Sequence, residues 1–287
     1  MLINYINPIL ADVFFSTSFA CQKNYQQKTS TSIASGIVFN IIRATLLTVI
    51  LFCVCFFKPQ ITVYSLLMAF LGSIVVFGYT LASFPIIKAG GLSLYTLFLM
   101  TGGMIVPFIW GACFLDENIS LMQIGGIILI TGSIILSSAE NKKTGLGIIA
   151  LCILVFFLNG ASSVVSKLHQ METHFSTIGT YDYMFWANAF SLVLSFLLLP
   201  VAKSTQKTKV SPGALVIAFA AAITNGIASY YNLMGAVNLP ATVLYPLVTG
   251  GTMVFSFLME VVFFKEKLTL KNLLPIAISF AGTLMFL

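Results

Sequence analysis

Residues 244–269 read LYPLVTGGTMVFSFLMEVVFFKEKLT, and residues 94–120 read LYTLFLMTGGMIVPFIWGACFLDENIS. Both stretches begin with Leu-Tyr and continue through Thr-Gly-Gly into a long apolar run. Both then reach an acidic turn that is followed by a hydroxyl residue. The Leu-Tyr pairs lie 150 residues apart in a chain of 287 residues. The sequence therefore states the same pattern twice, about half its length apart.

The correspondence continues outside these two stretches. Tyr79-Thr-Leu-Ala-Ser83 corresponds to Tyr231-Asn-Leu-Met-Gly235, and Ser18-Phe-Ala-Cys-Gln-Lys23 corresponds to Ser162-Ser-Val-Val-Ser-Lys167. All of the matches keep the same order and fall at offsets of 144 to 152 residues. Chance similarity between apolar segments is the alternative, but several ordered matches at similar offsets argue for an internal repeat.

The composition places the chain in a lipid bilayer. Hydrophobic residues make up 59% of the chain and charged residues only 8%, and the mean hydropathy is +1.02. A soluble globular domain is typically about 25% charged, so this chain cannot present a charged surface to water over most of its area. The expected location is a cell membrane, which is the inner membrane if the source is bacterial.

Ten apolar segments are long enough to span a bilayer as helices, which takes about 20 residues each. They are residues 2–20, 33–57, 62–82, 91–114, 120–138, 145–167, 177–200, 211–233, 239–264 and 272–287. The first segment has no Lys or Arg before it and is expected to be a retained helix. Two of the breaks are weak, the one near Lys88 and the uncharged one at Asn238-Leu239-Pro240. Continuous apolar runs of this length predict an all-α membrane protein.

The repeat and the ten segments together predict two five-helix units, residues 1–138 and residues 145–287, joined by the loop 139–144. Because five is odd, each unit ends on the opposite side of the membrane from where it began, so the second copy is inverted. Inverted repeats of this kind are typical of transporters. Two such halves can exchange conformations and open a central site first to one side and then to the other.

The chain resembles the EamA type of the drug/metabolite transporter superfamily over nearly its whole length. The resemblance rests on the five-plus-five helices, the acidic turns DENIS and KEKLT, the glycine-bearing last helices GGIILITGSIIL and PIAISFAGTLMFL, and the Arg in FNIIRATLL. The Trp-Gly usual in the first helix is replaced by Phe15-Ser16, and this departure bears on the substrate more than on the fold. Members of the family export or import amino acids, other small metabolites and drugs.

Two charged residues lie well inside predicted spans, where a charge costs about 3 kcal/mol on insertion scales. Asp12 is interpreted either as a proton-coupling or substrate-linked carboxylate, or as a group that lies near an interface or pairs with a neighbour. Arg43 is the only arginine of the chain. Its planar guanidinium can hold a carboxylate through two parallel hydrogen bonds, and a structural ion pair with Asp12 is the alternative.

Further polar and aromatic residues within the spans are candidates for the wall of a substrate cavity. Amides inside a bilayer need partners, and aromatic rings with polar tips either anchor the protein at the interface or line the cavity. The candidate substrate-binding residues are Asp12, Asn40, Arg43, Tyr79, Tyr95, Asn159, Trp186, Asn188, Tyr231 and Tyr245.

Glycines and prolines in the fourth and ninth predicted helices have a mechanical interpretation. Small residues let helix backbones approach closely in lipid, and a proline kinks a helix. The residues assigned to packing or gating are Gly102, Gly103, Pro107, Pro246, Gly250 and Gly251.

An enzyme is not expected. The only histidines, His169 and His174, fall in one polar break, and the chain has no metal-ligand spacing, nucleophile motif or phosphate loop. No catalytic residue, cofactor or metal site is therefore predicted. The net charge of +6 is spread over the turns and suits anionic lipid headgroups, so nucleic acid is not an expected partner.

The predicted function is secondary-active transport of a small organic metabolite by alternating access, with protons as the candidate coupling ion. Arg43 favours an amino acid or another carboxylate-bearing compound. The alternatives are an exporter of drugs or organic cations and a non-transporting scaffold or receptor. The protein is expected to be a monomer or homodimer.

The orientation in the membrane can be judged from the lysines, because lysines in short loops favour the cytoplasmic side. When the loops are numbered along the chain, eleven lysines fall in odd-numbered loops, and only Lys58 and Lys167 fall in even-numbered loops. That distribution puts the termini outside, whereas the family resemblance implies cytoplasmic termini.

Overall fold

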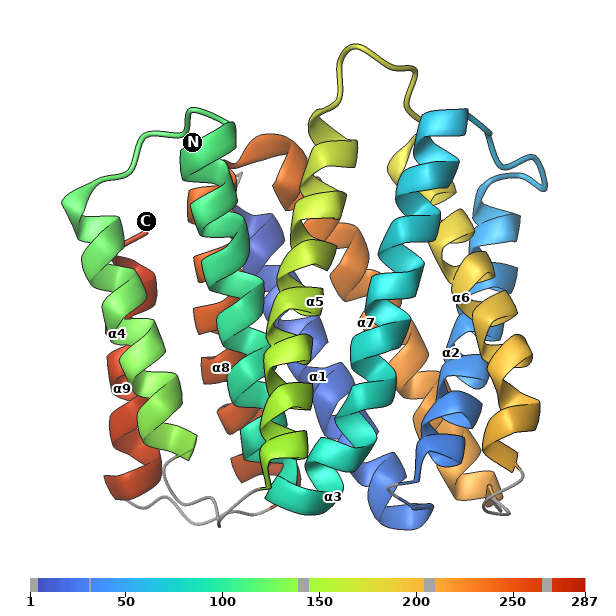
Figure 1. Ribbon diagram of the computed structural model, residues 1–287, viewed down its shortest axis with the longest axis horizontal. Coiled ribbons are helices and arrows are strands. Elements are labelled where there is room, and N and C mark those ends of the chain that lie inside the picture. The colour runs from blue at the N-terminus through green and yellow to red at the C-terminus, as the bar shows by residue number, and fades with distance from the viewer. Residues whose placement is uncertain (1–4, 31, 139–144, 204–209, 265–269, 287) are drawn as a thin grey trace.

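The computed structural model describes residues 5–30, 32–138, 145–203, 210–264 and 270–286, and these residues are helical apart from short connections. The helices are α1 (Ile6–Lys28), α2 (Ile33–Val54), α3 (Val63–Phe114), α4 (Leu121–Ser138), α5 (Leu146–Met171), α6 (Thr180–Lys203), α7 (Pro212–Asn238), α8 (Ala241–Phe264) and α9 (Leu270–Leu284). They stand side by side in one bundle (Figure 1). The described residues confirm the predicted all-α class, and the predicted joining loop 139–144 lies outside them.

Six helical segments are long and apolar enough to cross a membrane, as expected for a multi-pass helical membrane protein. These segments are Ile33–Val54, Val63–Ser83, Leu146–Met171, Thr180–Pro200, Pro212–Asn238 and Ala241–Met259. Two shorter apolar helical segments are Phe98–Phe114 and Leu121–Ser133.

Helix α1 is not one of these six segments, because polar residues interrupt its apolar sequence. Asp12, Ser16 and Ser18 are all buried. The Ser16 hydroxyl donates to the Thr252 carbonyl at 3.0 Å, and the Ser18 hydroxyl donates to the Ala221 carbonyl at 3.1 Å. Since α1 packs against both α7 and α8, its polar groups find protein partners and do not have to face lipid.

The structure joins the third and fourth predicted helices into one element. The expected break near Lys88 is helical, and α3 runs from Val63 to Phe114 with Pro85 inside it. Figure 1 shows that α3 is not straight but turns back at the bottom of the view, which gives it two legs. A proline inside a helix removes a hydrogen bond and kinks the backbone, but it does not always end the helix. The uncharged break at Asn238 was predicted correctly, because α7 ends there.

Two helices continue through segments that were expected to be polar breaks. Helix α1 continues to Lys28, and α5 continues to Met171. The prediction that Lys167 and His169 lie in a loop is therefore wrong, since both lie in α5 and are only 3% and 2% exposed. His169 Nε2 lies 2.9 Å from the Ser65 hydroxyl. The side chains of Lys167 and His169 find hydrogen-bond partners on α3 and at the end of α7, whereas the sequence alone suggests that they are hydrated.

The helices pack in pairs that are distant in sequence. Helix α3 packs on α5, α2 on α6 and α4 on α9. Helix α1 lies against α7 and α8, behind α5 in the view of Figure 1. The two halves of the chain therefore interdigitate, and residues from both halves reach the middle of the bundle.

The four glycines of the repeated Thr-Gly-Gly motifs lie at close approaches between helices. A Cβ added at Gly102 would collide with the Phe156 backbone of α5, and one at Gly103 would collide with the Asn159 side chain. In α8, a Cβ at Gly250 would meet Thr283 of α9. The two prolines assigned with them, Pro107 and Pro246, lie inside α3 and α8.

Gly102→Ala is expected to destabilise the protein, because the added methyl group would lie 2.6 Å from the Phe156 Cα and the facing backbone cannot rotate away. Overpacking of this kind costs about 1–3 kcal/mol. Gly132→Ala is the matched control, since a Cβ there meets no atom within 4 Å and alanine favours the helix by about 1 kcal/mol. Thermal unfolding of both purified variants checks the expectation, which is wrong if Gly102→Ala and Gly132→Ala have the same melting temperature.

Candidate functional site

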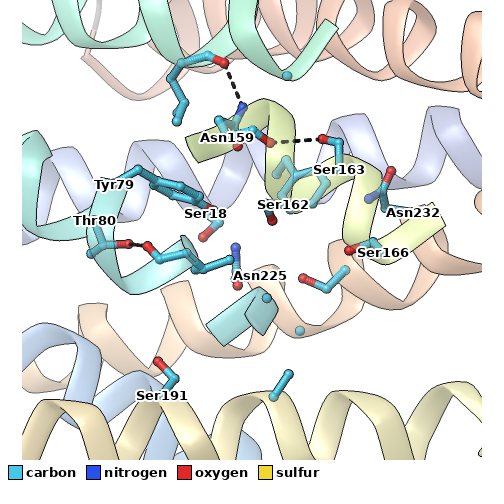
Figure 2. Close-up of a pocket in the computed structure, with 18 of the residues that line it drawn as sticks. Ser18, Tyr79, Thr80, Asn159, Ser162, Ser163, Ser166, Ser191, Asn225 and Asn232 are labelled. Carbon is cyan, nitrogen blue, oxygen red and sulfur yellow. Dashed lines mark hydrogen bonds between the residues drawn. The ribbon is translucent and has the colours of Figure 1, made fainter. Parts of the chain in front are cut away.

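A cavity of about 290 Å³ lies in the middle of the bundle and receives side chains from α1, α2, α3, α5, α6, α7 and α8. Part of its wall is apolar and includes Phe15, Phe39 and Leu233. The rest is rich in hydroxyl and amide groups, many of which Figure 2 shows directed toward the same space. Ligand pockets typically measure about 300–1,000 Å³, so this cavity fits a small metabolite.

Arg43 projects from α2 into this cavity. Its Nη1 donates to Asn225 Oδ1 of α7 at 2.9 Å, and its Nη2 donates to Asn40 Oδ1 at 2.8 Å. Asn40 is fixed in turn, because its Nδ2 donates to Ser191 Oγ at 2.9 Å and to Ser195 Oγ at 2.7 Å on α6. A chain of neutral partners thus holds the guanidinium across three helices. Among the described lining residues, Arg43 carries the only charge.

Asp12 is not in the cavity wall and does not pair with Arg43. The Asp12 side chain packs against Gly251 of α8 and is 3% exposed. It accepts a hydrogen bond of 3.0 Å from the hydroxyl of Thr252, a residue that does line the cavity. Of the two interpretations of Arg43, the ion pair with Asp12 is therefore wrong. The Asp12 carboxylate lies behind the cavity wall, and Thr252, with which it shares a hydrogen bond, lies between it and the cavity.

Four tyrosines from both halves form an aromatic part of the wall. Tyr79 and Tyr95 come from α3, Tyr183 from α6 and Tyr245 from α8. The Tyr245 hydroxyl donates to the Ser163 carbonyl of α5 at 2.6 Å. The aromatic rings add rigid apolar surface, and each phenol can donate and accept a hydrogen bond.

Helices α5 and α7 each carry a polar stripe that lines the cavity, and Figure 2 labels most of the residues of both stripes. The residues of the α5 stripe are Asn159, Ser162, Ser163 and Ser166, and those of the α7 stripe are Asn225, Ser229 and Asn232. Their spacing of three, four or seven residues puts each set on one helix face. Asn159 is fixed by its Nδ2, which donates to the Leu99 carbonyl at 2.7 Å. Asn232 Oδ1 is buried without a hydrogen-bond partner.

The structure brings most of the predicted substrate-binding residues together and leaves others outside. The cavity wall contains Asn40, Arg43, Tyr79, Tyr95, Asn159, Asn188 and Tyr245. Trp186 is elsewhere, since its Nε1 donates to the Gln60 carbonyl at 2.9 Å in an exposed contact. Tyr231 stacks on Phe14, with ring centroids 6.4 Å apart, and is not in the wall.

The wall also contains residues that the sequence analysis missed, above all the serines of the α5 and α7 stripes and Tyr183. The signal that could have found the stripes is their helical spacing, because Asn225, Ser229 and Asn232 recur on one face of an otherwise apolar helix. Among the described residues, no group of three or more His, Cys, Asp or Glu could hold a metal ion.

Lys167 of α5 holds the end of α7 next to the cavity. Its Nζ donates to the Ala236 carbonyl at 2.7 Å and to the Leu239 carbonyl at 2.5 Å. The last carbonyls of a helix have no partner within the helix, and a cation there also favours the negative end of the helix dipole. Lys167 therefore satisfies the end of α7 at a point where water has little access.

Glu117, in the connection between α3 and α4, holds the beginning of α8. Its Oε1 accepts from the Ala241 N–H and its Oε2 from the Thr242 N–H, both at 2.8 Å. An anion at a helix N-terminus satisfies free N–H groups and the positive end of the dipole. Lys167 and Glu117 thus fix the two sides of the α7–α8 joint, the break at Leu239 and Pro240.

Comparison with known proteins relates the chain to others through its fold. No family model matches the chain, and no curated protein matches it. Solved structures do match it. One of them, described only as the crystal structure of a protein, covers 99% of this chain and 96% of its own with a TM-score of 0.77 at 14% identity. At this identity the likeness shows the fold alone, which extends over essentially the whole chain.

Proposed function

We propose that the protein is a secondary-active carrier that moves a small organic metabolite across a cell membrane by alternating access. The observation that carries the proposal is the central cavity with Arg43 in its wall. A guanidinium inside an apolar bundle is costly, and this one has neutral partners only. Such a group is expected to meet a carboxylate that enters and leaves. An amino acid or another carboxylate-bearing compound is therefore the favoured substrate class.

The pattern of helix packing supports the inverted-repeat part of the proposal. In a five-plus-five repeat, α2 corresponds to α6 and α4 corresponds to α9, and each packs on its counterpart. The contacts of α1 with α7 and α8 are matched by the contacts of α5 with α3. A pseudo-two-fold axis in the membrane plane produces both features. The same arrangement favours the EamA type of the drug/metabolite transporter superfamily as the family.

The cavity charge weighs against the two alternatives. An exporter of organic cations would need an anionic or neutral cavity, and the described lining carries the positive charge of Arg43. A scaffold would have no use for a polar cavity between its halves.

Stabilisation of the purified protein by ligands tests the proposal. A ligand that binds only the folded state stabilises it by RT ln(1 + [L]/Kd). The panel consists of D-gluconate, L-lactate, L-alanine, L-glutamate, adenosine and choline. We expect at least one carboxylate to raise the melting temperature with increasing concentration, and Arg43→Gln to remove that rise. A response to choline alone would favour the cation exporter, and no response to any compound would favour the scaffold.

Asp12→Asn is expected to abolish accumulation of substrate driven by a pH gradient while exchange continues. The carboxylate contacts the cavity wall through Thr252 and can gain and lose a proton, whereas an amide of the same shape cannot. Uptake and exchange in proteoliposomes, with and without a pH gradient, measure the two activities separately.

Asp116→Asn is the control for that experiment. Asp116 has a φ of 50°, a conformation that asparagine also tolerates, and it lies in the connection that follows α3. Gradient-driven accumulation by Asp12→Asn at the level of Asp116→Asn would rule out the coupling role.

A further inference from the structure

We infer that the substrate of the proposed carrier is a small hydroxylated monocarboxylate, an organic acid with hydroxyl groups and without an ammonium group. This inference rests on the proposed function and narrows the substrate class of the same cavity. Three features carry it. The described lining has a single charge, the side-chain oxygens of Asn40 and Asn225 already accept hydrogen bonds from Arg43, and polar stripes on α5 and α7 line the cavity.

The single positive charge in the described lining favours a substrate with one negative charge. A guanidinium has five N–H donors, and the structure assigns one each from Nη1 and Nη2 of Arg43 to Asn225 and Asn40. Donors therefore remain for a carboxylate, which guanidinium groups bind in a bidentate manner. A phosphate monoester carries about −1.5 to −2 charges at pH 7. In this cavity that excess would have no described cation to balance it.

The ammonium group of an amino acid lacks a partner of the required kind. It carries a positive charge, and a charge in a low-dielectric site needs an opposite charge to balance it. No described lining residue is Asp or Glu. Asp12 is turned to Thr252 behind the wall, and the side-chain oxygens of Asn40 and Asn225 already accept from Arg43. Replacing the ammonium group by a hydroxyl removes the uncompensated charge.

The polar stripes supply the partners that substrate hydroxyls need. Ser162 on α5 and Ser229 on α7 line the cavity with hydroxyls that can both donate and accept. A hydroxyl of the substrate can exchange hydrogen bonds with these two serines, whereas an unsubstituted alkyl chain would leave both hydroxyls without a partner in the substrate. A site built to hydrogen-bond a hydroxyl discriminates strongly against the analogue that lacks it.

The test compares matched compounds on the purified full-length protein by ligand-induced stabilisation and by competition. D-gluconate is compared with hexanoate, which lacks the hydroxyls, with D-glucose, which lacks the charge, and with glycerol 3-phosphate. L-lactate is compared with L-alanine, which exchanges hydroxyl for ammonium. We expect D-gluconate to bind at least tenfold more tightly than hexanoate, glucose and glycerol 3-phosphate, and L-lactate to bind at least tenfold more tightly than L-alanine.

Variants identify the groups responsible. The double variant Ser162→Ala/Ser229→Ala should weaken D-gluconate at least tenfold and hexanoate less than threefold. Thr224→Ala is the matched control, because it removes a hydroxyl of α7 that donates to the Ala220 carbonyl of its own helix and is not in the cavity wall.

The outcomes separate this inference from the proposed function. L-alanine binding as tightly as L-lactate, or glycerol 3-phosphate binding more tightly than D-gluconate, would overturn the inference and leave a carrier of another substrate class. Equal binding of hexanoate and D-gluconate would overturn the role of the stripes. Failure of every compound to bind would overturn the proposed function and the inference with it.

Discussion

Arg43→Lys is expected to weaken the binding of a carboxylate substrate by roughly 10- to 150-fold, while the protein folds and expresses normally. Lysine keeps the positive charge but loses the planar fork that can hold two asparagines and a carboxylate at once. A hydrogen bond to a charged group is worth about 1.5–3 kcal/mol, which corresponds to that range of affinity.

Titration of the purified variant with D-gluconate measures the effect directly. Lys58→Arg is the control, since Lys58 lies after α2 and outside the cavity wall. An unchanged dissociation constant in Arg43→Lys would show that charge alone, and not the geometry of the guanidinium, serves the site. Bidentate binding of the substrate carboxylate by Arg43 would then be ruled out.

Lys167→Met is expected to produce the largest loss of stability, about 2–4 kcal/mol in the free energy of unfolding. The methionine keeps the apolar stem but leaves the Ala236 and Leu239 carbonyls without their donor. A buried polar group that loses its partner costs about 1–3 kcal/mol. Thermal unfolding in detergent, compared with Lys58→Met at an exposed position, measures the loss.

Glu117→Gln tests the other side of the α7–α8 joint. The amide retains one oxygen, but its NH₂ group then faces an N–H donor of Ala241 or Thr242. We expect a smaller loss, about 1–2 kcal/mol, as for other helix N-terminal partners. If Lys167→Met and Glu117→Gln both unfold at the temperature of Lys58→Met, the two residues do not hold the joint.

Cost in lipid led from the sequence to some of the residues of the cavity wall, but not in every case, since Asp12 lies behind the wall. Arg43, Asn40 and Asn159 stand out in apolar runs, and a polar group in a span must face a partner or a cavity. All three lie in the cavity wall. Aromatic residues carried no such constraint, because the same ring can anchor at an interface or line a cavity. Trp186 and Tyr231 were therefore misplaced, while Tyr79 and Tyr245 were not.

The rest depended on contacts between distant segments. Lys167 resembles a loop lysine in the sequence, and only the facing end of α7 explains its burial. Serine is small enough to serve as a packing residue in lipid, so the sequence alone did not assign Ser162 and Ser229 to the cavity wall. The weak turn near Lys88 rested on glycines and a proline, which kink a helix as readily as they end it.

Counterflow in proteoliposomes measures directly whether the protein carries an organic acid across a membrane. Vesicles containing the purified protein are loaded with unlabelled D-gluconate and diluted into a trace of labelled D-gluconate. We expect transient accumulation of label above its equilibrium level in wild-type vesicles, and none in Arg43→Gln vesicles or protein-free vesicles. Carrier function is contradicted if wild-type vesicles behave like protein-free vesicles with D-gluconate and with every other compound of the panel. The role of Arg43 in the substrate site is contradicted if Arg43→Gln exchanges substrate at the wild-type rate.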